Sequence, residues 1–302
     1  MNPAPSPVPP WAPPLLALQF LTRVPVPVLD RLEGPQVQAG LVRAVGWFPL
    51  VGTLIGMVTA GAVLGLAQFL PLAVAVIIAL MIEARLTGAF HEDAVADFCD
   101  AFGGGYTTED VRRIMKDSRI GSYGALGLGL AVALRAVLLM SLPVADDPLL
   151  TAAAIVASAC FARALVVAAM ALIAPAPAGT GLAKDIGNAV TARTVVMGAM
   201  TAFPALAAFA FLDGRALLAT VLAGGIFLIW LRGMLLRRIG GTTGDCLGFG
   251  AYTGQLILLL AAVAVAAAVV AAGPSARSRP AGSSARGQFA QAMPPSTTSS
   301  TT

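Results

Sequence analysis

Three acidic residues that follow the second long apolar run have a spacing that favours a metal site. Asp93, Asp97 and Asp100 stand at positions i, i+4 and i+7, so on a helix their carboxylates share one face. Like charges at this spacing repel each other, and lost hydration near a membrane increases the repulsion unless a cation intervenes. Oxygen ligands suit a hard divalent cation, so we predict that these residues bind Mg²⁺. The alternative is a solvated acidic helix end that binds nothing.

Four cations within eight residues form a second cluster, made up of Arg112, Arg113, Lys116 and Arg119. Cations beside metal-binding carboxylates suggest a substrate rich in phosphate. The alternative is that these residues set the membrane topology or bind anionic lipid head groups. That alternative does not explain Asp117 and Ser118, which stand between the cations. Thr107 and Asp110 offer a capping box, so we expect a short helix that ends near Gly121.

A glycine-rich segment, residues 240–248, forms a third cluster between the last two apolar runs. Glycines let the backbone approach a ligand closely, and successive N–H groups can form an anion-binding nest. Asp245 in this segment is free to bind a metal or to orient a hydroxyl group. The segment is not a Walker loop, because no Gly-Lys-Ser/Thr follows. The alternative is a turn that only links two membrane spans.

The composition shows what kind of protein must position these clusters. The chain has 302 residues, of which 58% are hydrophobic and 11% charged, and its mean hydropathy is +0.85. Soluble domains carry about 25% charged residues, so we expect an integral membrane protein. The low aromatic share of 6% suits closely packed helices and not a β-barrel. The fold class is therefore an all-α polytopic helix bundle.

Apolar runs long enough to cross about 30 Å of hydrocarbon predict about seven transmembrane helices. They lie near 43–68, 71–90, 121–143, 149–173, 194–212, 215–235 and 252–272. We expect residues 1–14 to be a disordered, proline-rich leader, residues 15–272 the membrane catalytic domain, and residues 273–302 a disordered tail. With the N-terminus inside, the basic loops fall on the cytoplasmic side, as the positive-inside rule requires.

Cysteine and histidine are too sparse to build a metal centre. Cys99, Cys160 and Cys246 lack the spacing of a zinc site, and their odd number argues against a disulfide framework. We interpret them as reduced packing residues. His91 is the chain's one histidine, so a bound metal would be held by carboxylates.

The three clusters together resemble the cobalamin synthase family, the adenosylcobinamide-GDP ribazoletransferases. The resemblance runs in family order through Gln19–Pro27, Trp47–Gly52, His91–Asp100, Ile114–Gly121 and Gly240–Asp245. It covers roughly residues 15–272. The combination of the Met-Lys-Asp-Ser-Arg-Ile-Gly segment with the Gly-Asp segment is highly specific.

The resemblance implies the last assembly step of the vitamin B12 lower ligand. Adenosylcobinamide-GDP and α-ribazole, or its 5′-phosphate, would give adenosylcobalamin, or its phosphate, and GMP. Expected partners are these two substrates, the lipid bilayer of the cell membrane and other enzymes of the corrinoid pathway, with no nucleic acid.

The residues can be assigned roles in that reaction. Mg²⁺ on the three aspartates would bridge phosphate oxygens, and Asp117 or Asp245 could take the hydroxyl proton. We expect Arg119 to contact the transferring phosphate, because few waters should compete near the start of the third span, and Arg112 to be an outward-facing topology charge. The expected substrate-binding residues are Arg113, Lys116, Ser118, Gly241, Thr242 and Gly244.

Two other functions would use similar residues. A membrane phosphotransferase for CDP-activated alcohols also uses aspartates and Mg²⁺, but its D-G-x2-A-R signature is not present in this sequence. A transporter would depend on ionisable groups inside the predicted spans, namely Glu83, Arg85, Arg135 and Arg163. The acids instead collect at one face of the membrane, which favours an enzyme.

Overall fold

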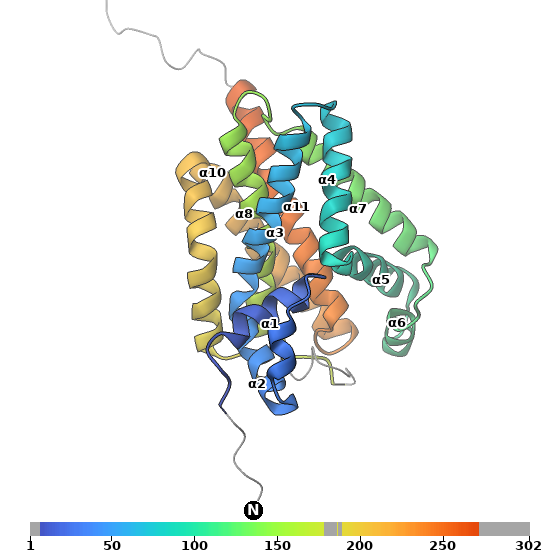
Figure 1. The fold of residues 1–302 in the computed structure, drawn as a ribbon. Helices are drawn as coiled ribbons and strands as arrows, with labels where there is room; N and C mark the ends of the chain where they lie inside the picture. Colours follow the sequence, from blue (N-terminus) through green and yellow to red (C-terminus); the bar gives the residue numbers. More distant parts are fainter. Residues whose placement is uncertain (1–6, 178–185, 187–188, 272–302) are drawn as a thin grey trace, which may run out of the picture.

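The computed structural model describes residues 7–177, 186 and 189–271, and the regular structure of this part is helical (Figure 1). The predicted all-α fold is confirmed. The predicted tail, 273–302, lies outside the described residues. The elements are α1 (Ala12–Leu21), η1 (Pro27–Arg31), α2 (Gly34–Ala44), η2 (Val45–Trp47), α3 (Phe48–Leu66), α4 (Leu72–Thr87), α5 (Phe90–Gly104), α6 (Thr108–Met115), α7 (Ser122–Met140), α8 (Pro148–Leu172), α10 (Ala192–Arg238) and α11 (Gly244–Ala271).

Proline marks where several helices begin, because a helix tolerates it in the first turn, where the missing N–H would be unbonded anyway. Pro49 and Pro148 lie in the first turns of α3 and α8, and Pro71 caps α4. Pro13 lies in the first turn of α1. The predicted leader, 1–14, is therefore too long by three residues, since the helix begins at Ala12 inside it.

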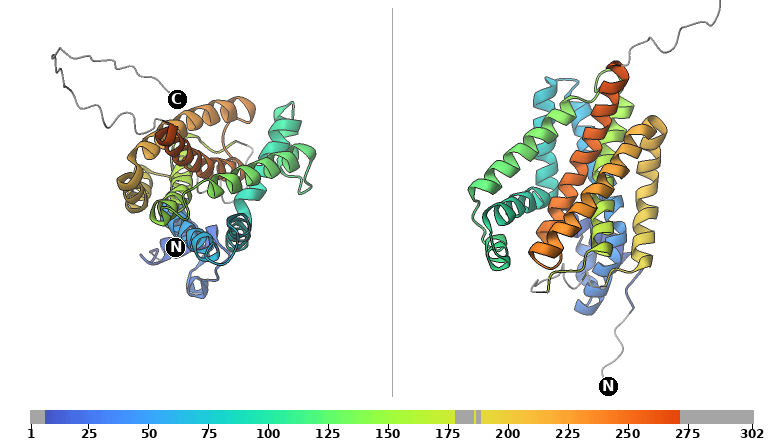
Figure 2. Two further views of the ribbon diagram at one scale, coloured as in Figure 1. Left: turned by 90° about the horizontal axis from the view of Figure 1, so that it is seen from above. Right: turned by 180° about the vertical axis from the view of Figure 1, so that it is seen from behind.

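The membrane-crossing helices agree with the predicted number of spans. Five described helices are long and apolar enough to cross a bilayer, and the pair α4–α5, bent by 90°, makes a sixth if it is counted as one span. α4 is the apolar part of this pair, and α5 turns away from it along the end of the bundle (Figure 1). α10 contains two helices joined at Asp213, whose backbone is not helical and whose carboxylate accepts a hydrogen bond from the N–H of Ala216 at 3.0 Å. The two halves of α10 run in opposite directions (Figure 2, right), so α3, α4, α7, α8, α10 and α11 provide seven apolar segments.

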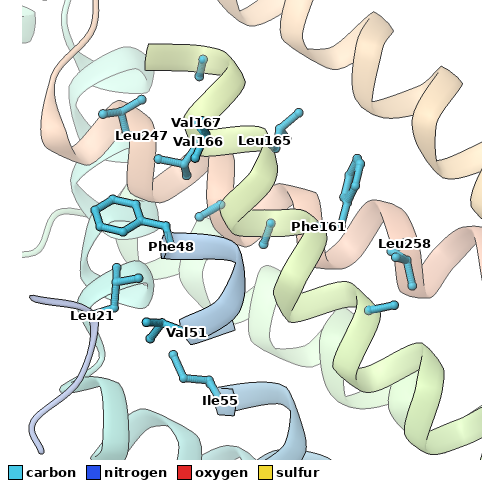
Figure 3. Close-up of a cluster of buried hydrophobic side chains, with 14 of the residues drawn as sticks. Leu21, Phe48, Val51, Ile55, Phe161, Leu165, Val166, Val167, Leu247 and Leu258 are labelled. Atoms are coloured by element: carbon cyan, nitrogen blue, oxygen red, sulfur yellow. The ribbon is translucent and has the colours of Figure 1, made fainter. Parts of the chain in front are cut away.

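The core lies around α8, which packs against α3, α10 and α11. Its apolar side chains meet those of α1, α3 and α11 (Figure 3). On the outside of the bundle, large apolar side chains are exposed, among them Phe203, Phe211 and Ile226. A soluble protein would not expose so many, so this surface suits contact with lipid.

The short elements gather at one end of the bundle. α1, α2, α5 and α6 all lie at the lower end in Figure 1, and α11 ends at the opposite side. The connection from α10 to α11, residues 239–243, is at the same lower end (Figure 2, right). All three chemical clusters of the sequence are therefore at this end.

A buried ion pair joins the spans just above this end. Glu83 of α4 and Arg135 of α7 are each 3% exposed, and the Arg135 Nη2 donates to Glu83 Oε2 at 2.6 Å. The Thr59 hydroxyl of α3 donates to the same oxygen at 2.6 Å. Arg135 also lies 3.8 Å from the Glu92 carboxylate of α5 and 5.6 Å from the ring centre of Tyr252 in α11. One guanidinium thus contacts groups from three other helices, α4, α5 and α11, and Glu83 extends the network to α3 through Thr59.

We predict that Arg135→Gln lowers the free energy of unfolding by about 3 to 5 kcal/mol, because it leaves the Glu83 carboxylate buried without its partner. SDS-induced unfolding of the purified protein measures this. The matched control is Arg85→Gln, on the exposed side of the same α4 as Glu83, with a change of at most about 0.5 kcal/mol. Equal effects at the two positions would show that the pair adds nothing to stability.

Candidate active site

The acidic residues of α5 lie on a helix, as their spacing predicts, with Asp93 exposed and Asp97 and Asp100 partly buried. α11 packs against this helix at Gly248, where any Cβ would overlap the Ala94 side chain. This close approach brings Asp245, in the first turn of α11, near α5. We call Asp93, Asp97 and Asp245 the carboxylate cluster.

The electrostatics of the carboxylate cluster favour a bound cation. Partial burial, with the negative charges of Asp93, Asp245 and Asp100, raises the pKa of Asp97 to about 6. Within the described part of the chain, no other side chain forms a hydrogen bond or ion pair with the three carboxylates. The repulsion is thus not relieved by any cation among the residues that the structure describes.

The cluster can supply only part of a metal coordination sphere. Among the described residues, no three groups of the metal-binding types lie close enough to hold an ion by themselves. Mg²⁺ is commonly bound by one or two carboxylates, with waters and substrate phosphates as the remaining ligands. The cluster fits that kind of site, and we keep Asp93 and Asp97 as candidate ligands with Asp245 beside them.

Asp100 has a different role from the one that its spacing suggests. Its two carboxylate oxygens accept hydrogen bonds from the backbone N–H groups of Gly121, at 2.6 Å, and Gly124, at 2.8 Å. These are orphan donors at the start of α7, and a carboxylate there also interacts favourably with the helix dipole. Asp100 is thus a cap that attaches α5 to α7, with both oxygens already engaged.

We predict opposite stability effects for two neighbouring acids. Asp100→Asn replaces one accepting oxygen by an NH₂ group and should lower the free energy of unfolding by about 1 kcal/mol. Asp97→Asn removes a repelled charge and should leave stability unchanged or raise it. SDS-induced unfolding in EDTA at neutral pH measures both variants, and a loss at Asp97 equal to that at Asp100 would contradict this assignment.

The basic cluster begins on the predicted short helix. In α6 the Thr107 hydroxyl accepts from the Asp110 N–H at 3.1 Å, and the Asp110 carboxylate accepts from the Thr107 N–H at 3.4 Å, so the capping box is confirmed. The helix ends at Met115 and not near Gly121. The chain turns after it because the Asp117 carboxylate accepts the backbone N–H of Arg119 at 3.1 Å, an interaction typical of turns.

Asp117 and Arg119 bind each other. The guanidinium donates from Nε at 3.0 Å and from Nη2 at 2.7 Å to the two carboxylate oxygens. These hydrogen bonds lower the pKa of Asp117 to about 2, which makes it a weak base. The Arg119 side chain is 87% exposed, so the expectation of few competing waters at Arg119 is wrong.

The other basic residues differ in whether their side chains are bound to other groups of the protein. Arg113 pairs with Asp110 at 3.2 Å on the surface. Lys116 and Ser118 are exposed, and their side chains form no hydrogen bond or ion pair within the described residues. Arg112 does not face outward as expected, because its Nη2 donates to the Ile239 carbonyl at 3.1 Å. It ties α6 to the glycine-rich segment.

The glycine-rich segment uses much of its backbone to hold the fold. Thr242 is buried, its N–H donates to Ala174 O and its own carbonyl accepts from Ala176 N–H, both at 2.9 Å. A Cβ on Gly241 would crowd the Ala174 carbonyl. Gly244 begins α11 directly before Asp245. Gly241 and Thr242 thus have a structural role, and their predicted contact with the substrate stays a prediction.

The basic and glycine-rich clusters touch each other directly. The Thr108 hydroxyl donates to the Arg238 carbonyl at 2.8 Å, and the Thr243 hydroxyl contacts the Met115 sulfur at 3.2 Å. Arg238 donates to Gly105 O. The structure therefore brings α5, α6 and the start of α11 into one site.

Two residues at this end of the bundle were not predicted as site residues from the sequence. Gln19 and Arg23 line a polar cavity together with Asp93. Both belong to the segment Gln19–Pro27, which carries part of the family resemblance. Membership of that segment was the sequence feature that could have identified them as site residues. The cavity itself depends on contacts between segments more than sixty residues apart.

Comparison with known proteins gives the family. A sequence model described as cobalamin-5-phosphate synthase matches residues 13–264. The chain belongs to the cobalamin-5-phosphate synthase family. The predicted family is thus confirmed.

Relatives of the family cover most of this chain. An adenosylcobinamide-GDP ribazoletransferase from Ralstonia pickettii is 37% identical over 245 residues, which are 80% of this chain and 91% of the relative. One from Shewanella frigidimarina is 36% identical over 255 residues, 83% of this chain and 93% of the relative. One from Shewanella amazonensis is 50% identical over 129 residues, 42% and 48% of the two chains. No solved structure matches.

Proposed function

We infer that the protein joins adenosylcobinamide-GDP to α-ribazole, or to α-ribazole 5′-phosphate, and releases GMP. The observation that carries this inference is the carboxylate cluster at the same end of the bundle as the exposed basic residues of the α6–α7 connection, in a family whose relatives carry the name of this activity. A site for a pyrophosphate needs both charges: carboxylates to hold a cation, and cations to bind phosphate oxygens.

The bond changes of this reaction are simple. A ribose hydroxyl oxygen of the second substrate forms a bond to the phosphorus next to the cobinamide arm. The bond from that phosphorus to the oxygen shared with the GMP phosphate breaks, and GMP leaves with the electron pair. The hydroxyl proton must go to a base within hydrogen-bond reach.

Asp245 is our choice for that base. Of the two candidates, Asp117 is held ionised by Arg119 and has a pKa of about 2, so it binds a proton weakly at neutral pH. Asp245 has no cationic partner within the described residues and lies near Asp93 and Asp97. It is placed to accept a proton from a hydroxyl that the cluster has bound.

Cations of the basic cluster bind the phosphates in this proposal. Lys116 is free of protein partners in the described structure, and the exposed partner of Arg113 is one that phosphate can replace. Arg119 keeps N–H donors beyond the two that it gives to the Asp117 side chain. Surface pairs of this kind add little stability, so exchanging them costs little. Ser118, between Asp117 and Arg119, offers a hydroxyl donor.

Mg²⁺ held by Asp93 and Asp97 would neutralise charge on the pyrophosphate as the bond to GMP breaks. The same ion would relieve the repulsion within the carboxylate cluster. We therefore propose Mg²⁺ as the cofactor of this site.

The site faces the cytoplasm in this proposal. The basic residues of α6 and of the ends of α10 lie at the end of the bundle that holds the site, whereas Asp146, Asp147 and Asp213 lie in the turns at the opposite end. The positive-inside rule then places the site on the cytoplasmic side.

The transporter alternative gains no support from the ionisable groups in the spans. Glu83 is paired with Arg135, and Arg163, 1% exposed, contacts the Ala159 carbonyl at 3.3 Å and the His91 ring at 3.5 Å. Arg85 lies apart from them on an exposed face. Glu83 and Arg135 thus join α4 to α7, and Arg163 links α8 to α5 through His91.

We predict that Asp97→Asn abolishes GMP release from adenosylcobinamide-GDP while the protein still inserts and purifies normally. The reason is the loss of a ligand for the cation, so higher Mg²⁺ should restore part of the activity. The assay follows GMP in proteoliposomes over a range of Mg²⁺ concentrations. Asp146→Asn, an exposed aspartate at the other end, is the control with unchanged activity. Wild-type activity of Asp97→Asn at ordinary Mg²⁺ would remove Asp97 from the site.

A further inference from the structure

A polar cavity of about 460 Å³ lies between the end of α1 and the bend from α4 to α5. Gln19, Thr22 and Arg23 line it from the α1 segment, and Thr87, Gly88 and Asp93 line it from the α4–α5 segment. Its volume is that of a typical small-molecule site. Of its lining residues, only Asp93 belongs to the site described so far.

The main chain fixes the position of Arg23 at this cavity. α1 buries Ala12, Leu16 and Ala17 against the bundle. The chain then leaves the helix at Thr22, and the Arg23 N–H donates to the Leu86 carbonyl at 2.7 Å, near the end of α4. Two segments far apart in the sequence are joined directly at the cavity.

The bend beside Arg23 has an unusual backbone. Gly88 has a φ of +72°, and Ala89, with a φ of +55°, is the one non-glycine residue with positive φ in the described part of the chain. Such conformations are disfavoured for residues with a Cβ, and they occur often at functional sites. A Cβ on Gly88 would overlap Arg23 Nε, so glycine is what lets the guanidinium lie against the bend.

The exposed Arg23 guanidinium has no partner among the described residues that would account for this placement. It forms no hydrogen bond or ion pair within the described residues, although its backbone is fixed and it shares the cavity with Asp93. A guanidinium offers five N–H donors in a planar fork that matches phosphate. Asp93 lines the same cavity, and an acid together with a guanidinium fits a phosphate ligand that carries a cation.

We propose that Arg23 binds a phosphate group of the nucleotide-bearing substrate in this cavity, which Asp93, a candidate ligand of the cation, also lines. The inference rests on the proposed function for the identity of that substrate. It adds a second cationic side to the site, formed by α1 and far from α6 in the sequence. The chemistry recognised is a phosphate ester, which a lipid head group also carries, so the test separates the two.

The first test is kinetic, in liposomes of phosphatidylcholine. Arg23→Gln should raise the KM for adenosylcobinamide-GDP by about tenfold or more and leave the KM for α-ribazole unchanged, with Arg23→Lys in between. Gly88→Ala should move the same KM, because it displaces the guanidinium. Arg31→Gln, an exposed cation on the same N-terminal segment, is the control with no change. Equal effects at Arg23 and Arg31, or no change in the KM, would overturn the proposal.

The second test needs no turnover and so separates this proposal from the proposed function. Equilibrium dialysis of the detergent-purified protein with GDP should show binding to the wild type that Arg23→Gln weakens about tenfold. If the wild type binds GDP in this way but releases no GMP from substrate, the proposed function fails and the phosphate site stands. If Arg23→Gln keeps GDP binding and loses activity only in liposomes with anionic phosphatidylglycerol, Arg23 binds a lipid head group and the proposal is wrong.

Discussion

The ion pair between Glu83 and Arg135 is the interaction on which the placement of the site depends. Charged groups inside a membrane protein must be paired, because an isolated charge there is costly. This pair joins α4 to α7, and the contacts of Arg135 with Glu92 and Tyr252 extend it to α5 and α11. It therefore fixes the helices around the point where α4 ends and α5 turns away.

That turn determines where the acids of α5 lie. With α5 bent 90° from α4 and capped onto α7 through Asp100, the remaining acids Asp93 and Asp97 come to lie near Asp245 of α11. This arrangement lowers stability, because like charges are held together with no cationic partner among the described residues. Such an arrangement is typical of a site whose ligand supplies the missing positive charge.

Much of the architecture was predictable from the sequence, because span length and apolar composition are local properties. The α5 acid spacing and the Thr107 capping box were predictable for the same reason. The role of each site residue was not predictable from the sequence. Asp100 resembles Asp97 in spacing, yet it caps a helix whose N-cap residue, Gly121, lies twenty-one residues later. Arg112 resembles a topology charge, yet it binds the Ile239 carbonyl. Contacts between distant segments decide such roles, and one sequence does not display them.

The carboxylate cluster should bind one divalent cation. Mn²⁺ titration of the detergent-purified protein, followed by the electron paramagnetic resonance signal of free Mn²⁺ in the presence of GDP, measures this directly. We expect one bound Mn²⁺ per chain that Mg²⁺ displaces, with affinity at least about tenfold weaker in Asp97→Asn and little changed in Asp146→Asn. Absence of bound Mn²⁺ in the wild type, or equal affinity in Asp97→Asn, would contradict it.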